Sequence, residues 1–218
     1  MSHFIPTGLA TWIARLVLVL SFCAGLATAQ LNSDNYTVLF GSGFLCDVND
    51  ASTCPATAKA VSGESYEVSG AGTFQAQNKS VRAAGTFNHK SANGNVVETG
   101  VWVATELVSF VSYGVAPGAL LQEKQGVNPL QFVPMRLKMF SVPMPTGGLA
   151  VFRVRLLTLS GVAKTGVLQV TCALGDVPRE RSVEGIRLSL DSDRNEFSDE
   201  VSGRVMFLST RQEASLNR

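Results

Sequence analysis

The chain has 218 residues, of which 45% are hydrophobic and 16% charged, with 18 Lys and Arg against 17 Asp and Glu. This balance argues against proteins that capture nucleic acid or an anionic membrane through general charge. No apolar stretch after residue 29 is long enough to span a bilayer as a helix.

The first 29 residues have the composition of a secretory signal peptide. Arg15 precedes an apolar stretch that runs to Leu26, and Ala27-Thr28-Ala29 supplies small residues for cleavage before Gln30. The sequence therefore predicts a signal peptide over 1–29, a secreted or periplasmic location, and one β domain over 30–218. That domain has 189 residues (218 − 29), enough for a substantial core.

Three cysteines remain after the predicted cleavage. Cys46 and Cys54 flank a short polar segment followed by Pro55, which predicts a disulfide that closes a surface loop in an oxidising compartment. Cys172 shares one face of a predicted strand with Leu168 and Val170, which favours a buried, unreactive thiol.

A glycine, a β-branched residue and an aromatic residue follow one another three times, at Gly72-Thr73-Phe74, Gly85-Thr86-Phe87 and Gly100-Val101-Trp102. The spacing suits one strand and one turn, and Asn93-Gly94 is a strong hairpin signal before the third copy. We expect three consecutive antiparallel strands, with the three aromatic rings at comparable levels of one wall.

Short β-prone runs continue along the chain. Besides the repeated strands, the expected ones cover 36–40, 65–69, 133–139, 152–156, 166–172, 185–190 and 203–208. Residues 143–148, Pro-Met-Pro-Thr-Gly-Gly, predict a hairpin turn between 133–139 and 152–156. About nine or ten strands without an amphipathic helix predict an all-β fold, a single antiparallel up-and-down β-barrel or alternatively a β-sandwich.

Few residues suggest catalysis. His89 is the only histidine after the leader, and Glu98 and Glu106 are further proton-transfer candidates; Glu98 lies across the same predicted hairpin. We expect His89 to be exposed near the hairpin tip. One histidine and no cysteine pair with zinc-like spacing predict no metal site, and no cofactor motif is recognised.

A basic patch is the constellation that the sequence favours as a binding site. The predicted hairpin would place Arg136 and Lys138 opposite Arg153 and Arg155, with all four side chains on the face away from the core. The hypothesis is that the patch binds an acidic glycan, a lipid headgroup or a small organic anion. Ordinary ion pairing on a solvated face is the alternative.

The run from Val68 to Gly114 resembles a group of small secreted bacterial proteins of unassigned function. The resemblance rests on Gly70-Ala71-Gly72-Thr73-Phe74, on 84–89 and on 100–105, together with Ser109-Phe110 and Tyr113-Gly114. The layout it implies is similar to the eight-stranded barrels of the allene oxide cyclase and dirigent type. This likeness concerns the fold and carries over no catalytic residue.

These observations favour a non-enzymatic protein that binds a small apolar or amphipathic molecule or an anionic partner. A barrel-type isomerase or cyclase is one alternative, and a structural envelope protein is another. An open cavity with a buried carboxylate would favour the isomerase or cyclase, whereas a closed core would leave binding at the surface. The sequence does not predict the oligomeric state.

Overall fold

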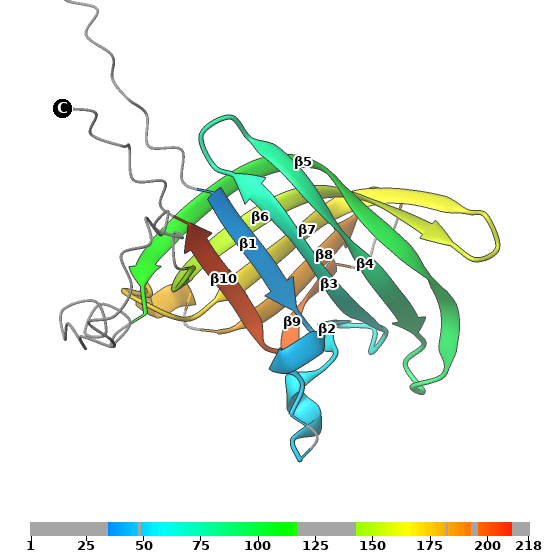
Figure 1. Ribbon diagram of the computed structural model, residues 1–218. Coiled ribbons are helices and arrows are strands. Elements are labelled where there is room, and N and C mark those ends of the chain that lie inside the picture. The colour runs from blue at the N-terminus through cyan, green and yellow to red at the C-terminus, as the bar shows by residue number, and fades with distance from the viewer. Residues whose placement is uncertain (1–34, 48, 117–142, 182, 193–195, 211–218) are drawn as a thin grey trace, which may run out of the picture. The chain divides into compact units, whose positions relative to one another are not determined.

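The computed structural model describes residues 35–47, 49–116, 143–181, 183–192 and 196–210, all within the compact unit Ser33–Glu213. The described part is built almost entirely of antiparallel strands (Figure 1). The strands are β1 (Asn35–Phe40), β2 (Ala56–Ala60), β3 (Ser65–Gln75), β4 (Ser80–Lys90), β5 (Val96–Val115), β6 (Met144–Thr158), β7 (Ala163–Cys172), β8 (Gly185–Leu190), β9 (Glu196–Ser202) and β10 (Val205–Thr210). Three short 3-10 helices are η1 (Gly43–Leu45), η2 (Ala51–Thr53) and η3 (Arg179–Arg181). The predicted leader and the predicted strand 133–139, with Arg136 and Lys138, lie outside the described residues.

The strand pairings close a ring of eight strands. Starting at β6, the order is β6-β5-β4-β3-β2-β9-β8-β7, and β7 pairs again with β6. The all-β, antiparallel class expected from the sequence is therefore confirmed. The strand ends that face each other at β2–β3, β4–β5, β6–β7 and β8–β9 all lie at one end of this ring, which we call the hairpin end.

β1 and β10 complete the other end of the wall. β1 lies against 70–75 of β3, beyond the part of β3 at 65–68 that pairs with β2. β10 pairs with β1 along its whole length and then reaches the start of β6 at 144–146. β1 and β2 therefore lie end to end along one edge of β3, separated by the loop that carries the disulfide.

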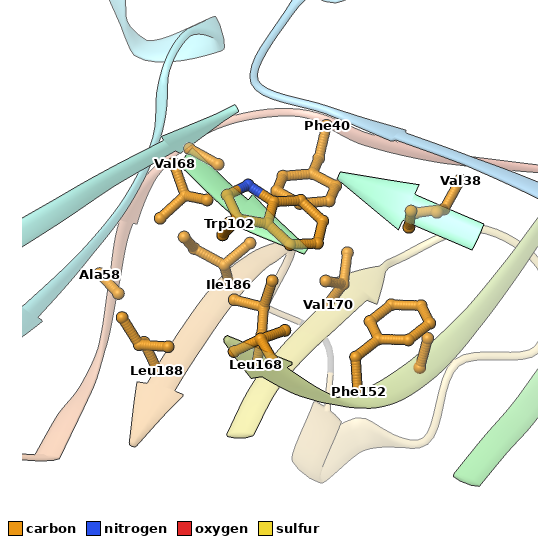
Figure 2. Close-up of a cluster of buried hydrophobic side chains, with 14 of the residues drawn as sticks. Val38, Phe40, Ala58, Val68, Trp102, Phe152, Leu168, Val170, Ile186 and Leu188 are labelled. Carbon is orange, nitrogen blue, oxygen red and sulfur yellow. The ribbon is translucent and has the colours of Figure 1, made fainter. Parts of the chain in front are cut away.

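The side chains that point into the ring form one apolar core (Figure 2). Strict alternation on β8, where Ile186, Leu188 and Leu190 are buried and Arg187 and Ser189 exposed, shows how each strand contributes its inner face. Phe40 stacks on Trp102 in the middle of this core, with ring centroids 5.7 Å apart.

The repeated glycine-aromatic strands are consecutive, as predicted, and become β3, β4 and β5. Their aromatic side chains are all buried, but the expectation of comparable levels is wrong. In the ladder Trp102 lies opposite Gly85, Phe87 lies opposite Gly100, and Phe74 lies opposite Val81, several residues further along. The strands are staggered, and the Trp102 and Phe87 rings each occupy the space that a glycine leaves on a neighbouring strand, Gly70 and Gly100 respectively.

Gly70 shows this most directly. A Cβ atom there would lie 2.2 Å from Cζ2 of Trp102, and the indole nitrogen of Trp102 donates a hydrogen bond to the Ser69 carbonyl at 3.1 Å. The glycine thus allows the indole to lie against the backbone of β3.

The predicted turn at 143–148 is wrong, because residues 144–148 belong to β6. β5 and β7 occupy the two edges of β6 at Arg153 and Arg155. The glycines have a packing role instead. A Cβ at Gly147 would lie 1.7 Å from the Leu174 carbonyl oxygen, and one at Gly148 2.8 Å from the Phe110 ring.

Among the described residues, no helix has the length and apolar character that crossing a membrane requires.

Candidate functional site

The interior of the ring is closely packed: among the described residues, most of the inward-facing aromatic and aliphatic side chains are no more than 3% exposed. A void of about 10 Å³ remains between Phe87, Trp102 and the aliphatic side chains beside them. This volume is at the lower limit for a single water molecule. The aromatic residues that the repeated motif supplies are therefore core residues.

His89 is buried, so the expectation that it is exposed is wrong. It is 9% exposed and lies on the inner face of β4 near the hairpin end. Its ring stacks on Tyr66 at 4.5 Å and meets the edge of Phe197 at 6.1 Å. The residue is close to the tip in sequence, but alternation along β4 turns it inward with Phe87.

The structure brings His89 and Glu98 together, as their place in one hairpin suggested. They are directly opposed in the β4–β5 ladder, and His89 Nδ1 lies 3.7 Å from Glu98 Oε2. The same carboxylate forms an ion pair with Lys164 of β7. Among the residues that the structure describes, neither imidazole nitrogen has a hydrogen-bond partner. A histidine–carboxylate pair of this kind can move a proton only if a substrate reaches it, and both nitrogens are closed off from solvent.

Glu106 is separate from this pair. It lies opposite Arg153 in the β5–β6 ladder, on the outer face of the sheet, whereas His89 points inward. The three proton-transfer candidates therefore do not form one site.

Arg153 and Arg155 lie on the outer face of β6, as predicted. Arg153 has an acidic neighbour, with its Nη1 3.8 Å from Asp191 Oδ2. Arg155 lies opposite Val103 of β5 and Thr165 of β7, and no ion pair involves it within the described residues. Two residues of the predicted basic patch thus lie within the described structure: Arg153, which has an acidic neighbour, and Arg155, which has no ion pair there.

The predicted disulfide between Cys46 and Cys54 is confirmed, and Cys172 is a buried free thiol. The disulfide closes a loop that includes η2 and packs against the junction of β9 and β10. Gly203 N–H donates to the Ser52 carbonyl at 2.7 Å, and Arg204 N–H donates to the Thr53 carbonyl at 3.0 Å. A Cβ at Gly203 would lie 2.3 Å from Ala56 Cα, so only glycine allows this close approach.

A surface cleft of about 420 Å³ lies beside this junction. Its walls are the disulfide loop at Asp50 and Ser52, the residues Val183 and Glu184 before β8, and the stretch 200–204. It lies where the ladder between β8 and β9 lapses, since these strands pair only at 188–189 with 196–197. At the cleft, side-chain contacts take the place of the backbone hydrogen bonds between β8 and β9.

Two carboxylates make these side-chain bridges. Glu184 Oε1 accepts a hydrogen bond from Val205 N–H at 2.7 Å. Glu200 Oε1 lies 3.2 Å from Arg187 Nε. Burial raises the pKa of the Glu200 carboxyl, and the facing Arg187 opposes this shift. These contacts give a partner to the backbone N–H of Val205 and to the carboxylates of Glu184 and Glu200.

The outer rim of the cleft carries exposed charges of both signs. The Asp50 carboxylate accepts hydrogen bonds from the Ser52 hydroxyl at 2.6 Å and from the Ser52 N–H at 3.0 Å, which lower the pKa of Asp50. Arg204 is more than half exposed, and its Nη2 lies 4.0 Å from Asp50 Oδ2. Val183 and Val201 add exposed apolar surface. The cleft therefore offers ionic, hydrogen-bonding and apolar contacts within one volume.

Sequence reasoning did not find this cleft. Its residues come from three separated segments, and none belongs to a recognisable motif. Gly203 was the one available signal, but a glycine at the start of an expected strand does not indicate a close approach to residues 150 positions earlier. Within the described residues, no group of three His, Cys, Asp or Glu side chains is arranged to hold a metal ion.

Comparison with known proteins gives no family assignment: no protein-family model, no curated protein and no solved structure matches this chain.

Proposed function

We propose that the protein is a secreted, non-enzymatic β-barrel that binds a small amphipathic molecule on its outer surface, in the cleft beside the disulfide loop. One observation carries the proposal: the interior is filled, while about 420 Å³ is open between the disulfide loop and 200–204. Ligand sites are concave and combine apolar lining with a few polar groups, and this cleft has both.

The ring of eight antiparallel strands supports a barrel over a β-sandwich. A ring has no free sheet edge to protect, whereas two stacked sheets would leave four. Secretion rests on the leader-like segment 1–29 and is supported by the Cys46–Cys54 disulfide, which persists in oxidising compartments.

The filled interior and the open surface cleft favour a protein that binds a ligand at its surface over an isomerase or cyclase that works inside the barrel. A barrel enzyme of that kind needs a cavity that admits a substrate to its proton-transfer groups. His89 and the neighbouring Glu98 have the right chemistry, but the imidazole is buried and packed against Tyr66 and Phe197.

Native mass spectrometry of the protein purified from its own host tests the proposal. We expect a bound small molecule on the wild type and its loss from Val201→Trp, because an indole on this half-exposed rim residue fills the cleft. Val61→Trp is the matched control: Val61 is fully exposed at the β2–β3 turn, and this variant should keep the adduct.

A wild-type protein without any adduct would contradict the proposal. An adduct that persists in Val201→Trp would also contradict it, since the molecule would then bind elsewhere.

A further inference from the structure

The Cys46–Cys54 disulfide lies at the surface, outside the apolar core. Cys46 is exposed and Cys54 is half-buried, and neither belongs to the cluster of buried side chains inside the ring. Both cysteines lie in the connection between β1 and β2, so the bond joins no strand of the ring to another. An exposed disulfide is accessible to a reductant, and such bonds are more often labile or regulatory than buried ones.

The bond closes the disulfide loop, residues 46–54, which contributes little to the core. Within its described residues, Thr53 is the only buried side chain, and it is polar. The Thr53 hydroxyl accepts a hydrogen bond from Asp47 N–H and donates one to the Asp50 carbonyl, both at 2.8 Å. These contacts lie within the loop. The loop therefore lacks the hydrophobic contacts that hold the strands together.

Few contacts attach the disulfide loop to the barrel. Among the described residues, two backbone hydrogen bonds do so, from Gly203 N–H to Ser52 and from Arg204 N–H to Thr53. The ion pair between Asp50 and Arg204 is long, at 4.0 Å, and about half of each side chain is exposed, so it adds little. The disulfide therefore supplies a large share of what keeps the loop in place, because it limits the conformations of the undocked loop.

The disulfide loop is also one wall of the cleft beside it. Asp50 and Ser52 line the cleft, and so do Gly203 and Arg204, to which the loop is attached. Release of the loop would remove this wall. The side chains packed inside the ring would keep their neighbours, since the loop has no part in that core.

We infer that the Cys46–Cys54 bond is a redox switch for this cleft. The oxidised bond holds the disulfide loop against 203–204, and the cleft is formed. Reduction by a dithiol releases the loop from the barrel, and the cleft loses one wall. The consequence for ligand binding rests on the proposed function, whereas the release of the loop does not.

The reduction is a thiol–disulfide exchange in two steps. A thiolate of the reductant attacks one sulfur of the Cys46–Cys54 bond, which breaks to give a mixed disulfide and one free cysteine. The second thiol of the reductant attacks the mixed disulfide and releases the other cysteine. The dithiol ends as an internal disulfide, and its two electrons and two protons are transferred to Cys46 and Cys54. Exchange with an oxidised disulfide reverses both steps.

Backbone amide NMR of the folded protein with and without dithiothreitol tests the switch. We expect reduction without denaturant, seen as a mass increase of two hydrogen atoms. The amide signals of Gly203 and Arg204 should then shift, and their hydrogen exchange should accelerate at least about 30-fold. The amide signals of β4 and β8 should stay in place, because the barrel remains folded. Oxidised glutathione should restore the starting spectrum.

Two variants serve as controls. Cys46→Ser/Cys54→Ser should give the spectrum of the reduced protein at 203–204 with and without dithiothreitol, because it has no bond to reduce. Cys172→Ala should respond to dithiothreitol as the wild type does, since Cys172 is a buried free thiol outside the loop.

Native mass spectrometry separates the switch from the proposed function. A small-molecule adduct on the oxidised protein that is lost on reduction supports both. An oxidised protein without an adduct contradicts the proposed function alone, and the amide signals still decide whether reduction releases the loop.

Three results would overturn the inference. The first is a bond that dithiothreitol does not reduce in the folded protein, and the second is a reduced protein in which the signals of Gly203 and Arg204 do not change. The third is a change of equal size throughout the barrel, because the bond would then support the whole fold. An adduct that stays on the reduced protein would likewise overturn control of the cleft.

Discussion

The inward and outward side chains of β5 differ in how far they are exposed to solvent. Trp102 and Leu107 point inward and are at most 1% exposed, whereas Val101, Val103 and Val111 point outward and are 43–47% exposed. Both faces are apolar. The inner face is buried in the core and supplies most of the stability, while the three outer valines keep nearly half of their surface exposed. Apolar character alone therefore does not tell which side of a strand faces the core.

The largest effect is expected when the inner face is truncated. Trp102→Ala removes a fully buried indole, its stack on Phe40 and its hydrogen bond to the Ser69 carbonyl. The free energy of unfolding should fall by about 3–5 kcal/mol, measured by urea denaturation. Val103→Ala, one residue away on the outer face, should cost less than about 0.5 kcal/mol. Equal losses for the two variants would mean that the outer face is also core.

The inner thiol of β7 should be protected in the same way. Burial, with a smaller effect of the Glu184 carboxylate, raises the pKa of Cys172 from 9.0 to about 11. At pH 8, alkylation of Cys172 by iodoacetamide should be at least about 100-fold slower in the folded than in the urea-unfolded protein, because the thiolate is the nucleophile. Similar rates in both states would show that this part of the core opens readily.

The same pKa shift gives a pH dependence. Between pH 9 and 11 the unfolded thiol releases its proton while the folded one keeps it, so the free energy of unfolding falls as the pH rises. Cys172→Ala lacks this contribution and should lose less stability over that interval than the wild type does.

Removal of the disulfide should have a somewhat smaller effect. Cys46 and Cys54 are separated by 8 positions, and opening a loop of this size should lower the free energy of unfolding by about 2–3 kcal/mol. The Cys46→Ser/Cys54→Ser variant should unfold at the same urea concentration as the reduced wild type. A change under about 0.5 kcal/mol would show that the junction at Gly203 holds the loop without the bond.

Of the substitutions considered, Gly70→Ala should lower the free energy of unfolding least. Gly70→Ala places a methyl group against the indole of Trp102 and should cost about 1–3 kcal/mol through overpacking. The cost should shrink in the Trp102→Ala background, where the methyl group has space. Strictly additive losses would contradict the claim that the glycine serves the indole.

Much of the architecture could be predicted because it depends on local patterns. Period-two alternation located β8 and most of β7, and Asn93-Gly94 located the β4–β5 turn, where Gly94 has a φ of +81°. The disulfide followed from a short polar loop. These signals are contained within a few neighbouring residues.

The misjudged features depend on distant contacts. Gly147 and Gly148 resemble turn residues, but they are needed for contact with Leu174 and Phe110. β2 is a run of small residues whose inner face is alanine, which has low strand propensity. The cleft could not be predicted at all, because its walls meet only when the disulfide loop packs against the β9–β10 junction.

The most direct test of the contrast between the two faces is a methyl-resolved NMR experiment with dissolved benzene as an apolar probe. If the interior is closed and recognition takes place outside, benzene gives intermolecular NOEs to the methyl groups of Val101 and Val103. It then gives none to those of Val68, Leu156 and Leu188, which line the residual void. NOEs to these inner methyl groups in the native protein would show that the ring admits a ligand and would contradict the account.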